Sequence, residues 1–480
     1  MPSVSQLLLN QAEHDEAWKL FGDFSARYLE TVADRPVYPD VDRHALRQIM
    51  DAPMPRAGST LGALFEELEA VIVPNATQSA HPRFLPYVQP TPNAISPYAD
   101  AVASLLGQNC NLWHLSPSAN AVEQAVIRWF ADLFGFPGKA GGLITSGGSA
   151  ANLIALTAAR DNALGEKART HGLQGQSAPL ILYTSDEVHS STDKAVSILG
   201  LGTDNLRRLA TDDAFRMRTD LLAEAVAKDR REGRQPFCVV ASAGTVTTGA
   251  IDPIAELSAF CKREGLWLHI DGAYGALTVL SDRYQAAMSA IGMVDSVSLD
   301  PHKFLFCPAE AGCVIVRDRA HLRHSFSATP SYLTMSEDPD FIDYANYGPQ
   351  LTRSFKALKV WWSLKLFGTD AYARIIDRMS DLATYMGTAI EQSGTLELLS
   401  PVVFNCVCFK AKSLDVAGNR AVLKRLVDSG DAFLGPASVK GEIGLRACFM
   451  NLRTSEADID LIIDRTGKIA AEVALSAQGA

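Results

Sequence analysis

The chain has 480 residues and a formal net charge of -10 at pH 7, with 47% hydrophobic and 20% charged residues. This length predicts roughly two or three domains, and the acidic balance argues against a nucleic-acid partner, whose phosphates bind basic surfaces. The N-terminal residues lack the pattern of a signal peptide, and no run reaches the roughly 18 apolar residues of a membrane span. The eight cysteines include no Cys-x-x-Cys pair, so we expect buried reduced thiols, no metal site and a cytoplasmic protein.

The first part of the chain, residues 1–80, is predicted to be a helical arm. Residues 5–31 and 60–73 carry apolar side chains at helical spacing. Pro36 and Pro39 make the segment between them an extended connector. Because two helices and a connector bury little surface by themselves, we expect the arm to pack on the main domain or on a second subunit.

Short apolar runs alternate with helical patterns in residues 81–385, the predicted large domain. The runs are continuous and rich in β-branched residues, as is typical of strands buried on both faces. They are Gly142–Thr145, Leu180–Thr184, Phe237–Ser242, Trp267–Asp271, Ser296–Leu299 and Cys313–Val316. Helical patterns such as Ala150–Leu164 and Ile254–Glu264 lie between most of them. This alternation predicts an α/β fold with right-handed crossovers and a mainly parallel sheet.

Residues 386–480 are predicted to form a smaller α+β domain. A helix leads into it, and a strand-rich run, a helix, two strands and a final helix follow: Asp370–Ser393, Leu396–Lys410, Ala417–Ser429, Ala432–Val439, Gly444–Met450 and Ser455–Ala470.

Groups of small or polar residues follow five of the predicted strands directly. They are residues 145–153 with Gly148 and Ser149, 183–191 with His189, 240–252, 268–274 with Asp271, and 298–304 with Lys303. In an open α/β sheet, ligands bind at the edge formed by the carboxyl ends of the strands. Five such groups with complementary chemistry therefore predict one ligand site there.

The residue types in these groups indicate a particular cofactor. Gly148 and Ser149 begin a helix, where unpaired N–H groups can hold a phosphate, although an ordinary turn is the commoner reading of such a sequence. A lysine and an aspartate that each close an apolar run are the two groups that a pyridoxal phosphate (PLP) enzyme requires. Lys303 would form the Schiff base with the cofactor aldehyde, and Asp271 would pair with the pyridinium nitrogen.

From His81 to Ala447 the chain resembles the group II PLP-dependent amino-acid decarboxylases, which include the aromatic L-amino-acid, histidine, glutamate and cysteine-sulfinate decarboxylases. The motifs that carry the resemblance are Asp300–Lys303, His269–Tyr274 and Asp186–Ser191. The resemblance implies PLP fold type I, similar to aspartate aminotransferase. It also implies a homodimer with active sites at the subunit boundary, in which the arm wraps around the partner.

The resemblance assigns the remaining roles as well. They are Ala273 on one face of the cofactor ring, His189 stacked on the other, and Gly148, Ser149 and His302 around the phosphate or Schiff-base end. In the family a loop tyrosine shortly before an Arg–Phe–Leu–Lys segment protonates Cα, and residues 341–349 occupy that place here. Tyr344 is the predicted proton donor, Tyr347 is the alternative, and residues 334–348 form the predicted lid. A plain surface loop with an incidental tyrosine is the competing reading.

Tyr87 and Thr91 mark the predicted substrate entrance, although the segment differs from the Tyr-Phe-Pro-Thr of the aromatic decarboxylases. Val246 likewise replaces a threonine. The predicted enzyme is a carboxy-lyase that converts an L-amino acid, with aromatic or other bulky side chains favoured, to the amine and CO₂. The alternatives are an oxidative deaminase that forms an aldehyde, an aminotransferase of the same fold, and a catalytically silent binding protein. Tyr344 and His189 favour simple decarboxylation.

Overall fold

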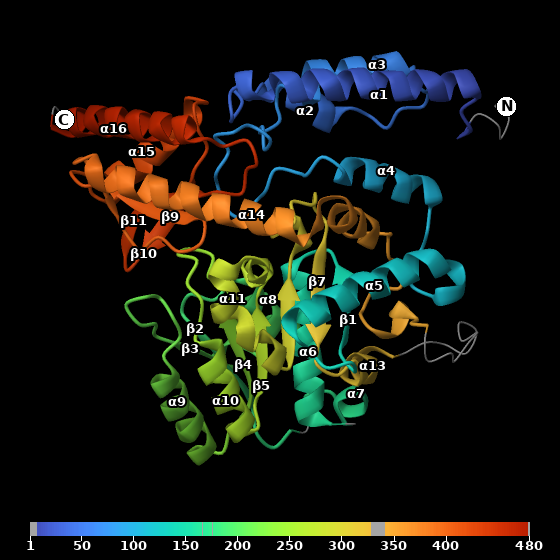
Figure 1. Ribbon diagram of the computed structural model, residues 1–480, viewed down its shortest axis with the longest axis vertical. Helices are drawn as coiled ribbons and strands as arrows, with labels where there is room; N and C mark the ends of the chain where they lie inside the picture. Colours follow the sequence, from blue (N-terminus) through green and yellow to red (C-terminus); the bar gives the residue numbers. More distant parts are fainter. Residues whose placement is uncertain (1–6, 166, 175, 328–340, 479–480) are drawn as a thin grey trace.

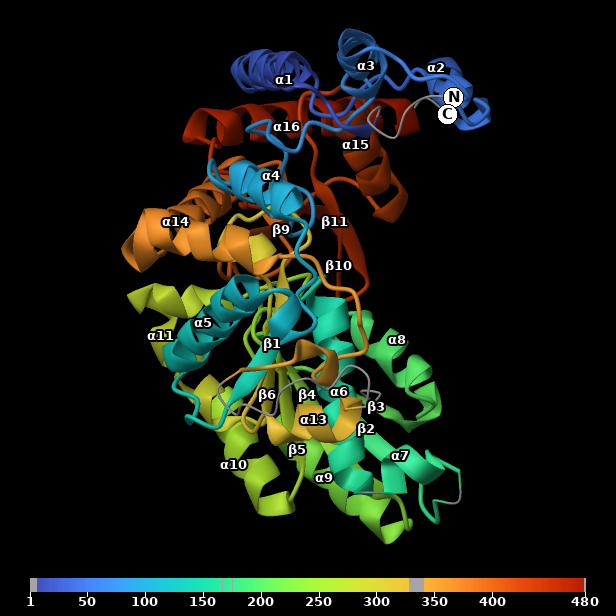
Figure 2. The ribbon, with the colours of Figure 1, turned by 90° about the vertical axis from the view of Figure 1, so that its right-hand side faces the viewer.

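The computed structural model describes residues 7–165, 167–174, 176–327 and 341–478. Along the chain they form a helical arm, a large α/β unit and a smaller unit that combines helices with a second sheet (Figure 1). The arm and the last two helices lie at one end of the long axis, and the large sheet fills the other end (Figures 1 and 2).

The large unit contains a seven-stranded sheet in the order β1-β7-β6-β5-β4-β2-β3. The pairings of β7 with β1 and β6 are antiparallel, and the other four pairings are parallel. The strands are β1 Gly141–Thr145, β2 Leu180–Ser185, β3 Leu206–Leu209, β4 Gln235–Ser242, β5 Trp267–Asp271, β6 Ser296–Leu299 and β7 Gly312–Val316. The prediction of a mainly parallel α/β sheet is confirmed.

Helices cover both faces of this sheet because its strands are apolar on both sides. Alternate residues point to opposite faces, so Ile181 and Tyr183 enter one core cluster and Leu180 and Leu182 enter another. One cluster includes side chains of α6, α8 and α13, and the other includes side chains of α5, α9, α10 and α14. The helices of this unit are α4 Ser96–Leu106, α5 Pro117–Phe134, α6 Gly148–Leu164, α7 Lys167–His171, α8 Ser191–Ile198, α9 Thr219–Arg231, α10 Ile254–Glu264, α11 Asp282–Met288, α12 Pro301–Phe304 and α13 Ala320–Phe326.

The smaller unit has a four-stranded antiparallel sheet in the order β10-β11-β9-β8, flanked by helices. Its elements, with the long helix that leads into it, are α14 Ala357–Gln392, β8 Leu396–Leu398, β9 Cys406–Ala411, α15 Val416–Asp428, β10 Gly435–Val439, β11 Glu442–Cys448 and α16 Glu456–Gln478. The predicted strand-rich run, Leu396–Lys410, contains β8 and most of β9, and residues 402–405 between them form no strand. Phe404 adopts a φ of 53°, and its buried ring packs against Tyr274 and Tyr284.

The arm consists of α1 Gln11–Thr31, α2 Arg43–Asp51 and α3 Leu61–Glu67, and a π-helical turn, Leu68–Ile72, follows α3. None of these three described helices has a buried residue. Large apolar side chains on them are exposed: Trp18, Phe21, Leu29, Ile49, Met50 and Leu64. Among the helices that the structure describes, none has the length and apolar content needed to cross a membrane.

Candidate active site

A cavity of about 380 Å³ opens at the carboxyl edge of the large sheet, and all five predicted groups contribute to its wall. The wall is formed by Ser146, Gly147, Gly148, Ser149, Ala150, Asn152, His189, Ser191, Ser242, Gly244, Thr245, Val246, Asp271, Ala273, Tyr274, Asp300, His302, Lys303 and Glu310. These groups meet because the strands that precede them end at the same edge. The structure therefore brings Lys303, Asp271, His189, Ala273 and the start of α6 to one site.

Lys303 lies on the short helix α12, directly after β6. Its Nζ is 3.2 Å from Oδ2 of Asp300, which is 2% exposed. The other oxygen of Asp300, Oδ1, has no hydrogen-bond partner among the described residues. The primary amine thus stands in the cavity beside a buried carboxylate, where it can react with a carbonyl group.

Asp271 is the last residue of β5, between Ser242 of β4 and Ser298 of β6. Its Oδ2 accepts a hydrogen bond from the amide of Asn152 (2.8 Å). Its Oδ1 accepts from the backbone N–H of Ala273 (3.2 Å) and from the Ser298 hydroxyl (3.3 Å). Hydrogen-bond donors favour the charged form of a carboxylate, so Asp271 is suited to hold a cationic ring nitrogen.

The start of α6 offers a cradle for an anion. No side chain caps this helix, and Gly147 and Gly148 bring its backbone to the cavity wall. A Cβ atom on Gly148 would lie 2.6 Å from the Cβ of Ala273 and 3.1 Å from Oδ2 of Asp300. Only glycine fits there, and the free N–H groups of a helix N-terminus bind phosphate well.

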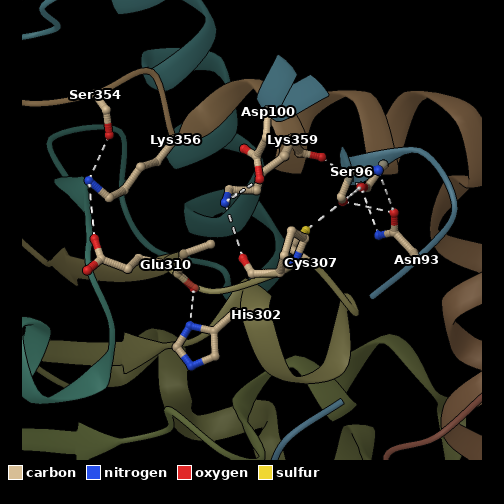
Figure 3. Close-up of polar contacts among 12 residues, drawn as sticks. Asn93, Ser96, Asp100, His302, Cys307, Glu310, Ser354, Lys356 and Lys359 are labelled. Carbon is tan, nitrogen blue, oxygen red and sulfur yellow. Dashed lines mark hydrogen bonds and ion pairs between the residues drawn. The ribbon is translucent and has the colours of Figure 1, made fainter. Parts of the chain in front are cut away.

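Two histidines line the cavity with defined hydrogen bonds. Nδ1 of His189 lies 2.8 Å from the hydroxyl of Ser191. Nδ1 of His302 donates to the carbonyl oxygen of Ala311 (2.8 Å; Figure 3), and burial lowers the pKa of His302. His302 Nε2 is 3.4 Å from Oδ2 of Asp300. Both imidazoles therefore have fixed orientations toward the cavity.

This set of groups fits PLP. The cavity presents an amine for the aldehyde, a carboxylate for the ring nitrogen, and a glycine-rich helix start for the phosphate. Ala273 and His189 supply a small apolar side chain and an imidazole, which are suited to the two faces of a ring. No group of three or more ligands that could hold a metal ion occurs in the described part of the chain.

A second cavity, of about 370 Å³, shares Glu310 with the first. Figure 3 shows its charged residues, which form two ion pairs. Lys356 Nζ lies 3.6 Å from Glu310 and 2.9 Å from the Ser354 hydroxyl, and Lys359 Nζ lies 3.0 Å from Asp100. Nothing in the sequence pattern indicated that these lysines adjoin the site.

The structure does not place Tyr344 beside Lys303 within one chain, so the assignment of Tyr344 as the proton donor stays a prediction. Tyr344 is 0% exposed, and its ring centroid is 4.7 Å from the guanidinium carbon of Arg353. Burial holds the pKa of its hydroxyl well above the ordinary value. Tyr347 is also buried in the core on the α6 face of the sheet, and neither tyrosine lines the Lys303 cavity. Residues 334–340 of the predicted lid lie outside the described residues.

The two predicted substrate residues also lie away from the Lys303 cavity within one chain. Tyr87 is 56% exposed and has a φ of 54°, and its carbonyl oxygen accepts a hydrogen bond from Arg446 (2.9 Å). Thr91 is buried, and its backbone N–H donates to the Met450 carbonyl (3.1 Å). Both belong to a segment that packs on the smaller unit.

Known proteins share this fold and are similar in sequence. Residues 44–412 match the pyridoxal-dependent decarboxylase conserved domain. An aromatic-L-amino-acid decarboxylase of Bacillus atrophaeus is 32% identical over 463 residues, which cover 95% of each chain. The crystal structure of Oryza sativa TDC with PLP and tryptamine superimposes with a TM-score of 0.91 at 26% identity, covering 97% of this chain and 99% of that one. The structure of Rhodiola rosea 4-hydroxyphenylacetaldehyde synthase gives 0.88 at 26% identity, with the same coverage.

The match to the domain covers most of the chain, and the fold and the chemistry of the cavity agree with it. The cofactor is PLP, the fold is PLP fold type I, and the protein is a PLP-dependent carboxy-lyase. The chain belongs to the group II PLP-dependent amino-acid decarboxylases.

Proposed function

We propose that the protein decarboxylates an L-amino acid with an aromatic or other bulky side chain to the amine and CO₂. The observation that carries this proposal is the meeting of Lys303, Asp271 and the α6 N-terminus around one cavity. The relative from Bacillus atrophaeus, named as an aromatic-L-amino-acid decarboxylase, supports the choice of side chain. The departures at residues 87–91 and at Val246 leave the particular amino acid to experiment.

The proposed roles follow from the geometry of the donors. When bound, PLP supplies the electron sink that makes loss of the substrate carboxylate feasible. Lys303 would hold the cofactor through its amine. Asp271, which accepts three hydrogen bonds, would pair with the ring nitrogen. The other proposed contacts are Ala273 and His189 on the ring faces, and Gly148, Ser149 and His302 around the phosphate or Schiff-base end.

Neither of the two tyrosines expected to donate a proton to Cα lines the Lys303 cavity within one chain. Tyr274 is the described tyrosine that lines the cavity, and its hydroxyl is engaged with Asn405 Oδ1 (2.6 Å). Tyr344 and Tyr347 are in the core. Of the twelve tyrosines in the chain, Tyr332 is the one that lies outside the described residues. Because neither Tyr344 nor Tyr347 lines the cavity, we propose Tyr332 as the residue to test for this role.

A homodimer with shared active sites is part of this proposal. We propose residues 1–80 as the arm. Its three described helices expose apolar side chains such as Trp18 and Phe21 and contain no buried residue. A second subunit would cover them and could bring Tyr87 and Thr91 to the site of its partner. Each subunit would contain one large domain, residues 81–385, and one small domain, residues 386–480. Cytoplasmic location is proposed because all eight cysteines are buried free thiols.

One experiment tests the proposal and its main rival. Purified protein is supplied with PLP and a panel of L-amino acids, and CO₂, amine, aldehyde and peroxide are measured together. We expect one amine per CO₂ and borohydride labelling of Lys303. One aldehyde and one peroxide per CO₂ would instead establish the oxidative deaminase, which the similarity to 4-hydroxyphenylacetaldehyde synthase favours. Failure to bind PLP would establish a silent binding protein.

A further inference from the structure

A buried asparagine on α6, Asn152, lies between Asp271 and the interior of the large sheet. Its side chain is 1% exposed and has polar partners on three sides. The amide nitrogen donates to Oδ2 of Asp271 (2.8 Å) and to Oγ of Ser191 (3.0 Å). The amide oxygen lies 3.0 Å from Nε2 of His269. The orientation of one amide thus affects three groups, of which Asp271 and Ser191 line the Lys303 cavity.

A chain of hydrogen bonds runs from Asn152 through His269 and Ser296 to Trp267. The amide oxygen of Asn152 can only accept, so Nε2 of His269 carries the ring proton and donates it (3.0 Å). Nδ1 of the neutral His269 ring then accepts from the Ser296 hydroxyl, 2.9 Å away. The Trp267 indole donates to the same Ser296 oxygen (2.8 Å). If the Asn152 amide were reversed, its oxygen would face the Asp271 carboxylate and its N–H groups would face the donating Nε2 of His269.

Burial keeps His269 in the form that this chain requires. His269 is fully buried, and burial lowers its pKa to about 4, although the charge of Asp271 acts in the opposite direction. A neutral imidazole has one donor and one acceptor nitrogen, and Ser296 and Asn152 satisfy both. The neutral ring therefore accepts a hydrogen bond from Ser296 and donates one to Asn152, and it places no second charge beside Asp271.

The second hydrogen of the Asn152 amide connects Asn152 to His189 through Ser191. It is donated to Oγ of Ser191, and the Ser191 hydroxyl can then donate to Nδ1 of His189 (2.8 Å). The Ser191 backbone N–H donates to the same nitrogen (3.1 Å). With two donors on Nδ1, a neutral His189 carries its proton on Nε2.

We propose that Asn152 is a positioning residue that orients the Asp271 carboxylate and the His189 imidazole together, anchored through His269 to the Trp267–Ser296 pair. The inference rests on the proposed function, in which Asp271 faces the cofactor ring nitrogen and His189 faces the ring. Donation from Asn152 favours a charged Asp271. The same amide directs the Ser191 hydroxyl toward Nδ1 of His189, so one side chain acts on both groups.

Two substitutions separate the contacts of the amide. N152D keeps the shape and the oxygen that faces His269, but it places an oxygen where the nitrogen lay 2.8 Å from Asp271. Two carboxylates so close do not both stay charged, so the pH profile of kcat/KM gains an ionisation. The absorbance of bound PLP titrates in the same pH range. N152L removes every polar contact, and we expect the apoenzyme to bind PLP about 10- to 100-fold more weakly.

Double substitutions test whether Asn152 acts through the two groups named. If its effect on PLP affinity passes through Asp271, adding N152L to D271A weakens binding by less than about two-fold further, whereas independent effects multiply. If its effect on kcat passes partly through His189, S191A reproduces part of the loss, and the N152L–S191A pair is less than multiplicative. A merely structural role for Asn152 would give multiplicative effects in both cycles.

Asn419 provides a matched control, because it is also a buried asparagine with its amide bonded on both sides, at the start of α15. We expect N419D to lower stability and to keep the wild-type pH profile. The inference is overturned if folded N152D and N152L bind PLP with wild-type affinity and titrate as the wild type does. If N152L does not fold, N152D alone decides, since it preserves the shape of the residue. The wild type separates a failure of this inference from a failure of the proposed function. If the wild type binds PLP and releases CO₂, a negative result for the variants removes only the role of Asn152. If the wild type does neither, both proposals are wrong.

Discussion

Replacing Tyr344 with phenylalanine tests the reassignment of the proton donor. The Tyr344 hydroxyl is fully buried and has no hydrogen-bond partner among the described residues. An unpaired buried polar group costs about 1–3 kcal/mol, and loss of the oxygen leaves only a small void. We therefore expect Y344F to raise the free energy of unfolding by about 1 kcal/mol and to change kcat by less than about two-fold. Urea unfolding followed by circular dichroism, together with CO₂ release, measures both quantities.

Tyr183 is the matched control for this experiment. It is equally buried, but its hydroxyl donates to Oδ2 of Asp229 at 2.8 Å. A hydrogen bond to a charged group contributes about 1.5–3 kcal/mol, so Y183F should be destabilised by about 2 kcal/mol. Y332F should keep its stability and lose about 10²- to 10⁴-fold in kcat, the usual contribution of a general acid. A folded Y344F that loses more than about 100-fold in kcat would refute this reasoning and return Tyr344 to the chemistry.

Three further substitutions or conditions give sharp expectations. G148A should weaken PLP binding by about ten-fold or more, because the new Cβ would lie 2.6 Å from that of Ala273; titration of the apoenzyme measures this. E123Q should lower the free energy of unfolding by about 3–5 kcal/mol in urea, because it leaves the buried guanidinium of Arg353 without its charged partner. Burial lowers the pKa of His81 from 6.5 to about 4, so the stability contributed by its neutral form is present above pH 6.5 and is lost as the pH falls toward 4. Urea unfolding of wild type and H81Q across that range should show a steeper loss in the wild type, and equal slopes would contradict it.

The sequence was sufficient to predict the large sheet because its strands are apolar on both faces. Two of the predicted strands, Trp267–Asp271 and Ser296–Leu299, have the observed bounds. The edge strand Leu206–Leu209 was missed, because Arg207 and Arg208 stand between its two leucines and interrupt the apolar run. An edge strand is paired on one side only, so such polar residues are tolerated there.

The convergence at the cavity was predictable for a similar reason. Lys303, Asp271 and His189 each follow a strand, and parallel strands end at a common edge. Asn152 could not be found in this way, because a lone asparagine within a helical pattern gives no signal of the partners that surround it. Its neighbours His269 and Ser296 lie on the strands β5 and β6, and only the folded register brings them to α6.

Tyr344 shows that position along the chain does not determine position relative to the cavity. The resemblance assigns the proton donor to residues 341–349, and Tyr344 of that segment contacts Arg353. Arg353, however, pairs with Glu123 and donates to the Ile144 carbonyl (2.8 Å) inside the core, away from the cavity wall. The buried charge of Arg353 draws the polarizable ring of Tyr344 inward. A proton donor must instead reach the cavity, which these contacts of Tyr344 do not permit within one chain.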